Sequence, residues 1–101
     1  MTSGGLSFSL DGNPGEKNTL YLSGRLSVED LDKMLSFIEE FFRERRPAEI
    51  SVDLKEVTYM DSAGALFLLE LEHRAANESV PVNLLNMSFK EKGILDLIDR
   101  Q

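Results

Sequence analysis

The sequence predicts one α/β domain in which a four-stranded mixed β-sheet is combined with three helices in the order β-β-α-β-α-β-α. Three observations support this prediction. The length of 101 residues is near the common domain size. Short stretches of alternating apolar residues, typical of strands, are separated by longer stretches with apolar residues at helical spacing. Strands alternate with helices after the first two elements, which favours parallel pairing there. We therefore expect residues 1–101 to form a single domain.

The first two elements are predicted to form a β-hairpin. Leu6, Phe8 and Leu10 alternate with small or polar residues, as in a short strand. Residues 11–15 read Asp-Gly-Asn-Pro-Gly, which is a concentrated turn signal. Residues 19–22 follow as the second strand, which ends at a Ser-Gly pair.

The first helix is predicted to begin at Ser27 and to end before Pro47. Ser27 lies three residues before Asp30, and the first turn is rich in acidic residues, which the positive end of the helix dipole favours. Its apolar stripe is Val28, Leu31, Leu35, Ile38 and Phe42, flanked by Met34, Phe37 and Phe41. Arginines at 43, 45 and 46 suit the negative end of the helix.

The second half of the chain repeats the strand and helix pattern twice. Residues 50–54 alternate as a strand, and a helix opens at Asp61 and runs to about Asn77. Residues 80–85 form the fourth predicted strand. Ser88 and Glu91 fit a capping box, and apolar residues at 94, 95, 97 and 98 follow in a short last helix.

Composition excludes several classes of function. The chain has 11 basic and 18 acidic residues, a net charge of −7, which disfavours binding to nucleic acid or to anionic lipid by charge. It has no cysteine, so disulfides and thiolate sites are excluded. No apolar run approaches the ~20 residues that span a bilayer, and residues 1–5 lack the features of a secretory signal. We expect a cytoplasmic domain that does not insert into the membrane.

The segment Asp61-Ser62-Ala63-Gly64 is the strongest candidate for a site, because it lies where a strand passes into a helix. Gly64 permits close approach of the backbone, and the free N–H groups of a helix N-terminus favour an anion. Ser62 is therefore placed where a phosphate would be tolerated, or where its hydroxyl simply caps the helix.

The two sides of this helix differ in what they predict. The core side, at ~100° per residue, is Gly64, Phe67, Leu68, Leu71 and Ala75. The opposite side is Ser62, Ala65, Leu66, Leu69, His73 and Ala76. Leucines on an outward side indicate either a surface that binds a partner or a face that another helix, such as the last one, covers.

An enzyme is not expected. Ser62 and His73 share a face but lie roughly 16 Å apart along the helix, beyond hydrogen-bond reach. Asp53 and Asp61 suggest a magnesium site, but the acidic pair and the lysine that accompany such an aspartate in receiver domains are missing. Phosphate-binding glycine loops are missing too, so we expect no cofactor and no metal.

The sequence resembles a STAS domain, the fold of anti-sigma factor antagonists and of sulfate-transporter domains. The resemblance covers nearly the whole chain and lies in three stretches, Leu20-Tyr-Leu-Ser-Gly-Arg-Leu26, Ile50 to Gly64 (ISVDLKEVTYMDSAG) and Val82-Asn-Leu-Leu85. It implies an interaction module without enzymatic activity. In the antagonists a partner kinase phosphorylates the serine of the Asp-Ser-x-Gly motif, which matches Ser62, and the phosphate weakens binding to that kinase.

Two departures from the antagonists favour a subgroup. Leu66 stands where antagonists usually carry a second glycine, and Arg25 stands where an acidic residue is common. The run after Gly64 is more similar to STAS domains of Mla-type ABC lipid-transport permeases. The resemblance thus implies docking onto the ATPase or permease subunit, at the cytoplasmic face of the inner membrane, through Asp61, Ser62, Ala65, Leu66, Leu69 and His73.

The alternative is a stand-alone anti-sigma factor antagonist that binds a serine kinase or anti-sigma factor and is regulated at Ser62. The short C-terminus fits either a compact Mla-like domain or the N-terminal part of a longer permease chain.

Overall fold

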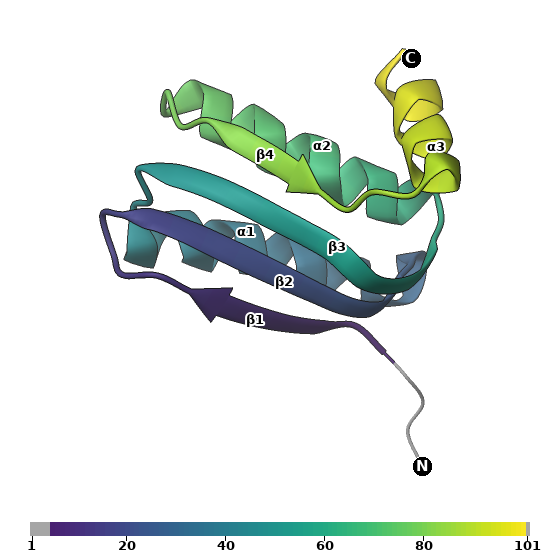
Figure 1. Ribbon diagram of the computed structural model, residues 1–101, viewed down its shortest axis with the longest axis horizontal. Coiled ribbons are helices and arrows are strands. Elements are labelled where there is room, and N and C mark those ends of the chain that lie inside the picture. Colours follow the sequence, from purple (N-terminus) through teal and green to yellow (C-terminus); the bar gives the residue numbers. More distant parts are fainter. Residues whose placement is uncertain (1–4, 101) are drawn as a thin grey trace.

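The computed structural model describes residues 5–100 and has the predicted order of elements (Figure 1). The strands are β1 (Ser7–Asp11), β2 (Lys17–Leu26), β3 (Glu49–Met60) and β4 (Val82–Leu85). The helices are α1 (Leu31–Arg45), α2 (Ser62–Asn77) and α3 (Phe89–Asp99), and a 3₁₀ turn, η1 (Val28–Asp30), precedes α1. Residues 1–4, in which no secretory signal is expected, lie outside the described residues, as does Gln101.

The four strands form one mixed sheet in the order β1-β2-β3-β4. β1 and β2 are antiparallel, with Phe8 opposite Leu22, which confirms the hairpin. β2 and β3 are parallel, as are β3 and β4, and Val52 lies between Leu20 and Leu84. The long crossovers that parallel pairing requires are supplied by α1 and α2.

The helices α1 and α2 lie behind one face of the sheet, and α3 stands near the start of α2 (Figure 1). The core forms between that face and the two helices. Its fully buried side chains include Leu20, Leu22, Ile50, Val52 and Leu54 from the strands and Met34, Phe42, Phe67 and Leu71 from the helices. Alternating residues of the strands supply one side of this core, as the period-2 pattern predicted.

The predicted apolar stripe of the first helix is wrong in two places. Val28 is 62% exposed and Leu35 is 39% exposed. The buried side of α1 is instead Met34, Ile38, Phe41 and Phe42. Aromatic stacking explains this rotation, because the Phe37 ring lies 4.4 Å from the Phe8 ring and 5.3 Å from the Phe41 ring.

Two boundaries near the site also differ from the prediction. The helical segment does begin after Ser27, but it begins as the 3₁₀ turn η1, and the side chain of Ser27 makes no capping hydrogen bond. β3 is 12 residues long and continues to Met60 instead of ending at Leu54. The longer strand delivers the chain directly to Asp61 and the start of α2.

Candidate functional site

Asp61 connects the end of β3 to the start of α2, and its carboxylate is the helix cap. Oδ1 accepts hydrogen bonds from the backbone N–H groups of Ala63, at 2.9 Å, and Gly64, at 3.2 Å. Oδ2 accepts a hydrogen bond from the backbone N–H of Val28 at 3.2 Å. One side chain thus satisfies free donors at the beginning of α2 and holds η1 beside it. This gives Asp61 a structural role in addition to its predicted place at the partner surface.

Gly64 lies where the first turn of α2 meets the end of β2. A Cβ atom at this position would lie 2.6 Å from the carbonyl oxygen of Leu26 and 2.7 Å from Cγ of Met60. The same Leu26 oxygen accepts a hydrogen bond from the N–H of Asp61 at 3.2 Å. The close backbone approach predicted for Gly64 is therefore present, and it draws the start of α2 against the sheet.

Ser62 is exposed and is the first residue of α2. The interpretation that its hydroxyl caps the helix is wrong, because Asp61 occupies the cap position and takes the N–H groups. Within residues 5–100 no hydrogen bond to Oγ of Ser62 is found. The hydroxyl is therefore accessible, with the Asp61 carboxylate as its chain neighbour.

The core side of α2 is as predicted, and the opposite side is narrower than predicted. Gly64, Phe67, Leu68, Leu71 and Ala75 are all buried. Ala65, expected at the partner surface, is fully buried and cannot take part in it. Ser62, Leu66, Leu69, His73 and Ala76 remain on the outward side, and we call the first four of them the α2 strip. Leu66 is 42% exposed, Leu69 is half-buried and His73 is exposed, as expected for a surface histidine.

The last helix packs against α2, as one of the two interpretations of the outward side allowed. Ala65 belongs to the buried core of the domain. The same packing raises the pKa of the Glu72 carboxyl, first because it is partly buried and second because the Asp99 carboxylate of α3 is near.

Three exposed residues near the junction of β3 and α2 were missed as site residues by the sequence analysis. The N–H of Val28 donates a hydrogen bond to Asp61, and Val28 is 62% exposed, although its place in a predicted apolar stripe had indicated burial. Tyr59 is 40% exposed, and the guanidinium of Arg25 lies 4.1 Å from its ring centre. Arg25 and Tyr59 are paired across β2 and β3, one position before the end of β3. The apolar alternation changes phase after Leu54, so it did not indicate where Tyr59 lies.

The structure separates Asp53 from Asp61, so the two residues do not form one site. Asp53 is in the middle of β3, about 25 Å before Asp61 along the strand. The pKa of Asp53 is lowered, mainly because the Asn86 amide donates to its carboxylate at 2.9 Å. In residues 5–100 no group of three His, Asp or Glu side chains could hold a metal ion. None of the helices in this part of the chain is long and apolar enough to span a membrane.

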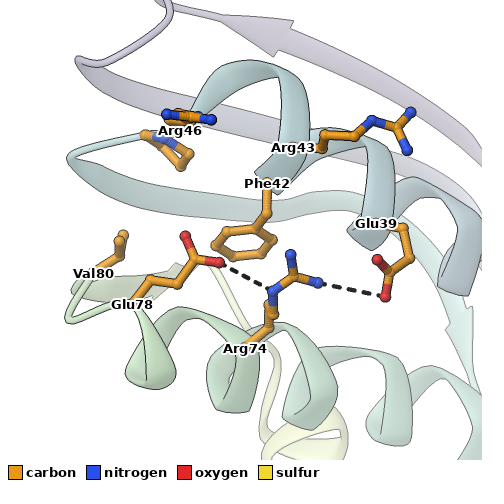
Figure 2. Close-up of a pocket in the computed structure, with 8 residues that line it drawn as sticks. Glu39, Phe42, Arg43, Arg46, Arg74, Glu78 and Val80 are labelled. Carbon is orange, nitrogen blue, oxygen red and sulfur yellow. Dashed lines mark hydrogen bonds and ion pairs between the residues drawn. The ribbon is translucent and has the colours of Figure 1, made fainter.

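A hollow of about 570 Å³ lies between the C-terminal parts of α1 and α2 (Figure 2). Arg74 lies between Glu78, at 3.1 Å, and Glu39, at 3.4 Å, and its guanidinium is 5.1 Å from the centre of the Phe42 ring. These contacts, led by the hydrogen bond to Glu78, raise the pKa of Arg74. The central cation of the hollow is therefore engaged in joining α1 to α2.

Comparison with solved structures shows the fold. Over 90% of this chain and 83% of the other, the unphosphorylated anti-sigma factor antagonist SpoIIAA matches with a TM-score of 0.73 and 19% identity. The phosphorylated form of SpoIIAA from Bacillus matches over 93% of this chain and 86% of the SpoIIAA chain, with a TM-score of 0.72 and 18% identity. The STAS domain of an anti-sigma factor antagonist from Rhodobacter sphaeroides matches over 81% of this chain and 87% of its own, with a TM-score of 0.66 and 13% identity.

Sequence comparison shows the family. A search of curated proteins finds no significant match. The family model described as "Mlab, STAS domain" matches residues 10–99, which include β2, β3, the Asp-Ser-Ala-Gly segment and all three helices. With the mixed four-stranded sheet and the junction built on Asp61 and Gly64, this match leads to one conclusion: the chain belongs to the STAS domain family.

Proposed function

We propose that this STAS domain is a non-enzymatic subunit or module of an ABC-type lipid or solvent-tolerance transporter, and that it docks onto the ATPase subunit through the α2 strip. The observation that carries the proposal is Leu66, a large apolar side chain that remains 42% exposed in the centre of the strip. The match of the MlaB family model supports the transporter as the setting. The place of action is then the cytoplasmic face of the membrane.

The chemistry of the strip suits a protein partner. Leu66 and the half-buried Leu69 offer apolar area, and the neighbouring Val28 extends it. Burying the exposed part of Leu66 would contribute about 1–2 kcal/mol. Asp61 and Glu70 border the strip with negative charge, so the partner should present an apolar depression with a basic rim.

The rigidity of the site also favours docking. Asp61 fixes the first turn of α2 through two hydrogen bonds and holds Val28 through a third, and Gly64 allows that turn to pack closely on Leu26. A preformed helix start loses little conformational entropy when a partner binds. The binding surface is therefore ready before the partner arrives.

Copurification from host membranes tests the proposal. The tagged domain is mixed with detergent-solubilised membranes, and recovered proteins are identified by mass spectrometry. Leu66→Asp is compared with Tyr21→Asp, a matched control because Tyr21 is also 42% exposed but lies on the sheet. An ABC ATPase recovered with wild type and Tyr21→Asp, and lost with Leu66→Asp, is the expected result. Recovery of the ATPase with Leu66→Asp would overturn the proposed surface.

The second candidate function is an anti-sigma factor antagonist switched by phosphorylation of Ser62. It is favoured by one observation, the exposed hydroxyl of Ser62 beside an occupied helix cap. Asp61 already takes the N–H groups of Ala63 and Gly64, so a phosphate on Ser62 would point outward and repel a partner. SpoIIAA, a structural neighbour, is known in phosphorylated and unphosphorylated forms.

Ser62→Glu distinguishes this candidate from a constitutive interface. If phosphorylation controls docking, the substitution lowers partner affinity at least tenfold, whereas Ser62→Ala keeps it. Unchanged affinity in Ser62→Glu would contradict the switch. Recovery of a serine kinase in place of an ATPase would move this candidate ahead of the transporter.

A further inference from the structure

The outer side of α3 carries a second apolar surface that the docking proposal does not use. Phe89 is 92% exposed and Leu97 is 61% exposed. Gly93 lies between them, so the three residues follow each other at intervals of four, on one side of the helix. We call these three residues the α3 strip. The opposite side of α3 packs against the domain through Glu91, Ile94, Leu95 and Ile98.

Gly93 has no structural reason to be glycine within a single copy of the domain. It lies in the middle of α3, where glycine weakens a helix relative to alanine. A Cβ atom built at this position meets no atom within 4 Å, and the backbone there is helical. Gly64, in contrast, is required by contacts inside the domain. The missing side chain of Gly93 leaves a gap between Phe89 and Leu97 that an approaching backbone would fill.

The arrangement of the α3 strip is symmetric about Gly93, with one large apolar residue one turn away on each side. A two-fold axis beside Gly93 would place the α3 helix of a second copy antiparallel to that of the first. Phe89 of one copy then meets Leu97 of the other, and the two glycines meet where the helices cross. We propose that two copies of this chain associate through their α3 strips in this antiparallel manner.

The charges along the border of the strip fit the same pairing. Lys92 and Asp96 border the same edge of the strip. Lys92 comes before Gly93 in the sequence, and Asp96 comes after it. In the antiparallel pair Lys92 of each copy comes beside Asp96 of the other. The N-terminal half of each helix also meets the C-terminal half of the other, so the helix dipoles attract. Lys92 and Asp96 therefore attract their counterparts in the antiparallel orientation, whereas a parallel pair would place like charges opposite each other.

Charge argues against a membrane as the occupant. Asp96 and Asp99 lie close to the strip, and the whole chain has a net charge of −7. An anionic bilayer would repel a domain of this net charge, and the three cations at α3, Lys90, Lys92 and Arg100, leave the chain at −7. The strip also points away from α2, so association through α3 leaves the α2 strip free and stands independently of the proposed function.

The expected association is weak, because one helix face buries less than a standard interface of roughly 1,600 Å². Sedimentation velocity from about 10 μM to about 1 mM protein measures it over the range that such small interfaces require. The average mass should rise from 11.4 kDa toward twice that value. A constant mass of 11.4 kDa over the whole range would overturn the proposal.

Gly93→Gln tests the crossing point. The added side chain meets nothing inside the domain and improves helix propensity, so the variant will fold. It should weaken association at least tenfold. The exposed Glu40→Gln on α1 introduces the same residue type elsewhere and should associate like wild type. Association that survives Gly93→Gln, or that is lost in Leu66→Asp, would place the interface away from α3.

A mixing experiment tests whether the charges along the border of the strip lie at the interface. Lys92→Asp places two acids, and Asp96→Lys two lysines, along this border, so each variant alone should remain monomeric. Mixed at equal concentrations, the two variants should form a heterodimer in which acids face lysines. A mixture that stays monomeric would contradict the proposed charge pairing.

Flotation with vesicles of phosphatidylcholine and phosphatidylglycerol tests the alternative, which is that the α3 strip binds a membrane. The proposal expects the protein to remain in the aqueous fraction with and without Phe89→Ser. Flotation that depends on Phe89, in a protein of constant monomer mass, would show that the strip meets a bilayer and would overturn the dimer.

Discussion

The Asp61 carboxylate accepts a hydrogen bond from the backbone N–H of Val28 at 3.2 Å, across 33 residues of chain. The same carboxylate caps α2. The start of the candidate site is therefore held to the segment that leads into α1 by a single side chain. Removing this side chain should loosen both helix starts together.

Asp61→Ala is expected to lower the free energy of unfolding by about 1–2 kcal/mol, because it removes the cap and leaves several N–H groups without a protein acceptor. Asp61→Asn, whose amide oxygen still caps, should retain most of the stability. Urea denaturation followed by circular dichroism measures both variants. Equal stability of Asp61→Ala and wild type would show that the hydrogen bonds at this junction contribute little.

Gly64→Ala and Gly93→Ala should change stability in opposite directions. A methyl group at Gly64 would contact the Leu26 carbonyl and Met60, so overpacking should cost about 1–3 kcal/mol. A methyl group at Gly93 meets nothing and should stabilise α3 by up to about 1 kcal/mol. Thermal unfolding at low protein concentration, where the chain is monomeric, measures both. Similar changes in the two variants would contradict the packing described for α2.

Ala65→Asp and Leu66→Asp separate the core from the surface at adjacent positions of α2. Ala65 is fully buried, so a carboxylate there should destabilise the domain by at least about 3 kcal/mol. Leu66 is 42% exposed, so a carboxylate there should cost less, about 1–2 kcal/mol for the part of the leucine side chain that is buried. Chemical denaturation compares the two variants. A loss of stability in Leu66→Asp as large as that in Ala65→Asp would show that Leu66 belongs to the core.

Glu72 should make the domain less stable as the pH rises. Partial burial and Asp99 raise its pKa in the folded state above the ordinary value, so the folded state binds the proton more tightly than the unfolded state. The free energy of unfolding therefore falls as the pH rises from the pKa of Glu72 in the unfolded chain to its raised pKa in the folded domain. Glu72→Gln should increase stability at neutral pH and flatten this part of the profile. Denaturation curves between pH 4 and pH 7 test it, and an unchanged profile would contradict the assignment.

The sequence was sufficient to predict the element order, the hairpin and the core side of α2. Those features depend on local periodicity and turn residues, which one chain carries in full. Leu68 and Leu71 follow from spacing alone. The strand end at Met60 was harder to place, because β3 becomes more exposed after Leu54 and its apolar alternation weakens.

The site itself was predicted only in part, because its details depend on contacts between distant segments. Ala65 is buried in the core, and no pattern within α2 indicates on which side α3 packs. Val28 was placed in a helical stripe, but the 3₁₀ turn and the bond to Asp61 turn it outward. The cap at Asp61 instead of Ser62 is a shift of one residue, which local sequence does not resolve.

The most direct test of the central claim is site-specific photo-crosslinking in the host cell. A photoreactive residue is placed at Leu66 or at Tyr21, which have equal exposure but lie on different surfaces of the domain. Crosslinked proteins are identified by mass spectrometry. Our account predicts a crosslink to an ABC ATPase from position 66 and none from position 21. An ATPase crosslink from position 21 alone, or a serine kinase at position 66, would contradict it.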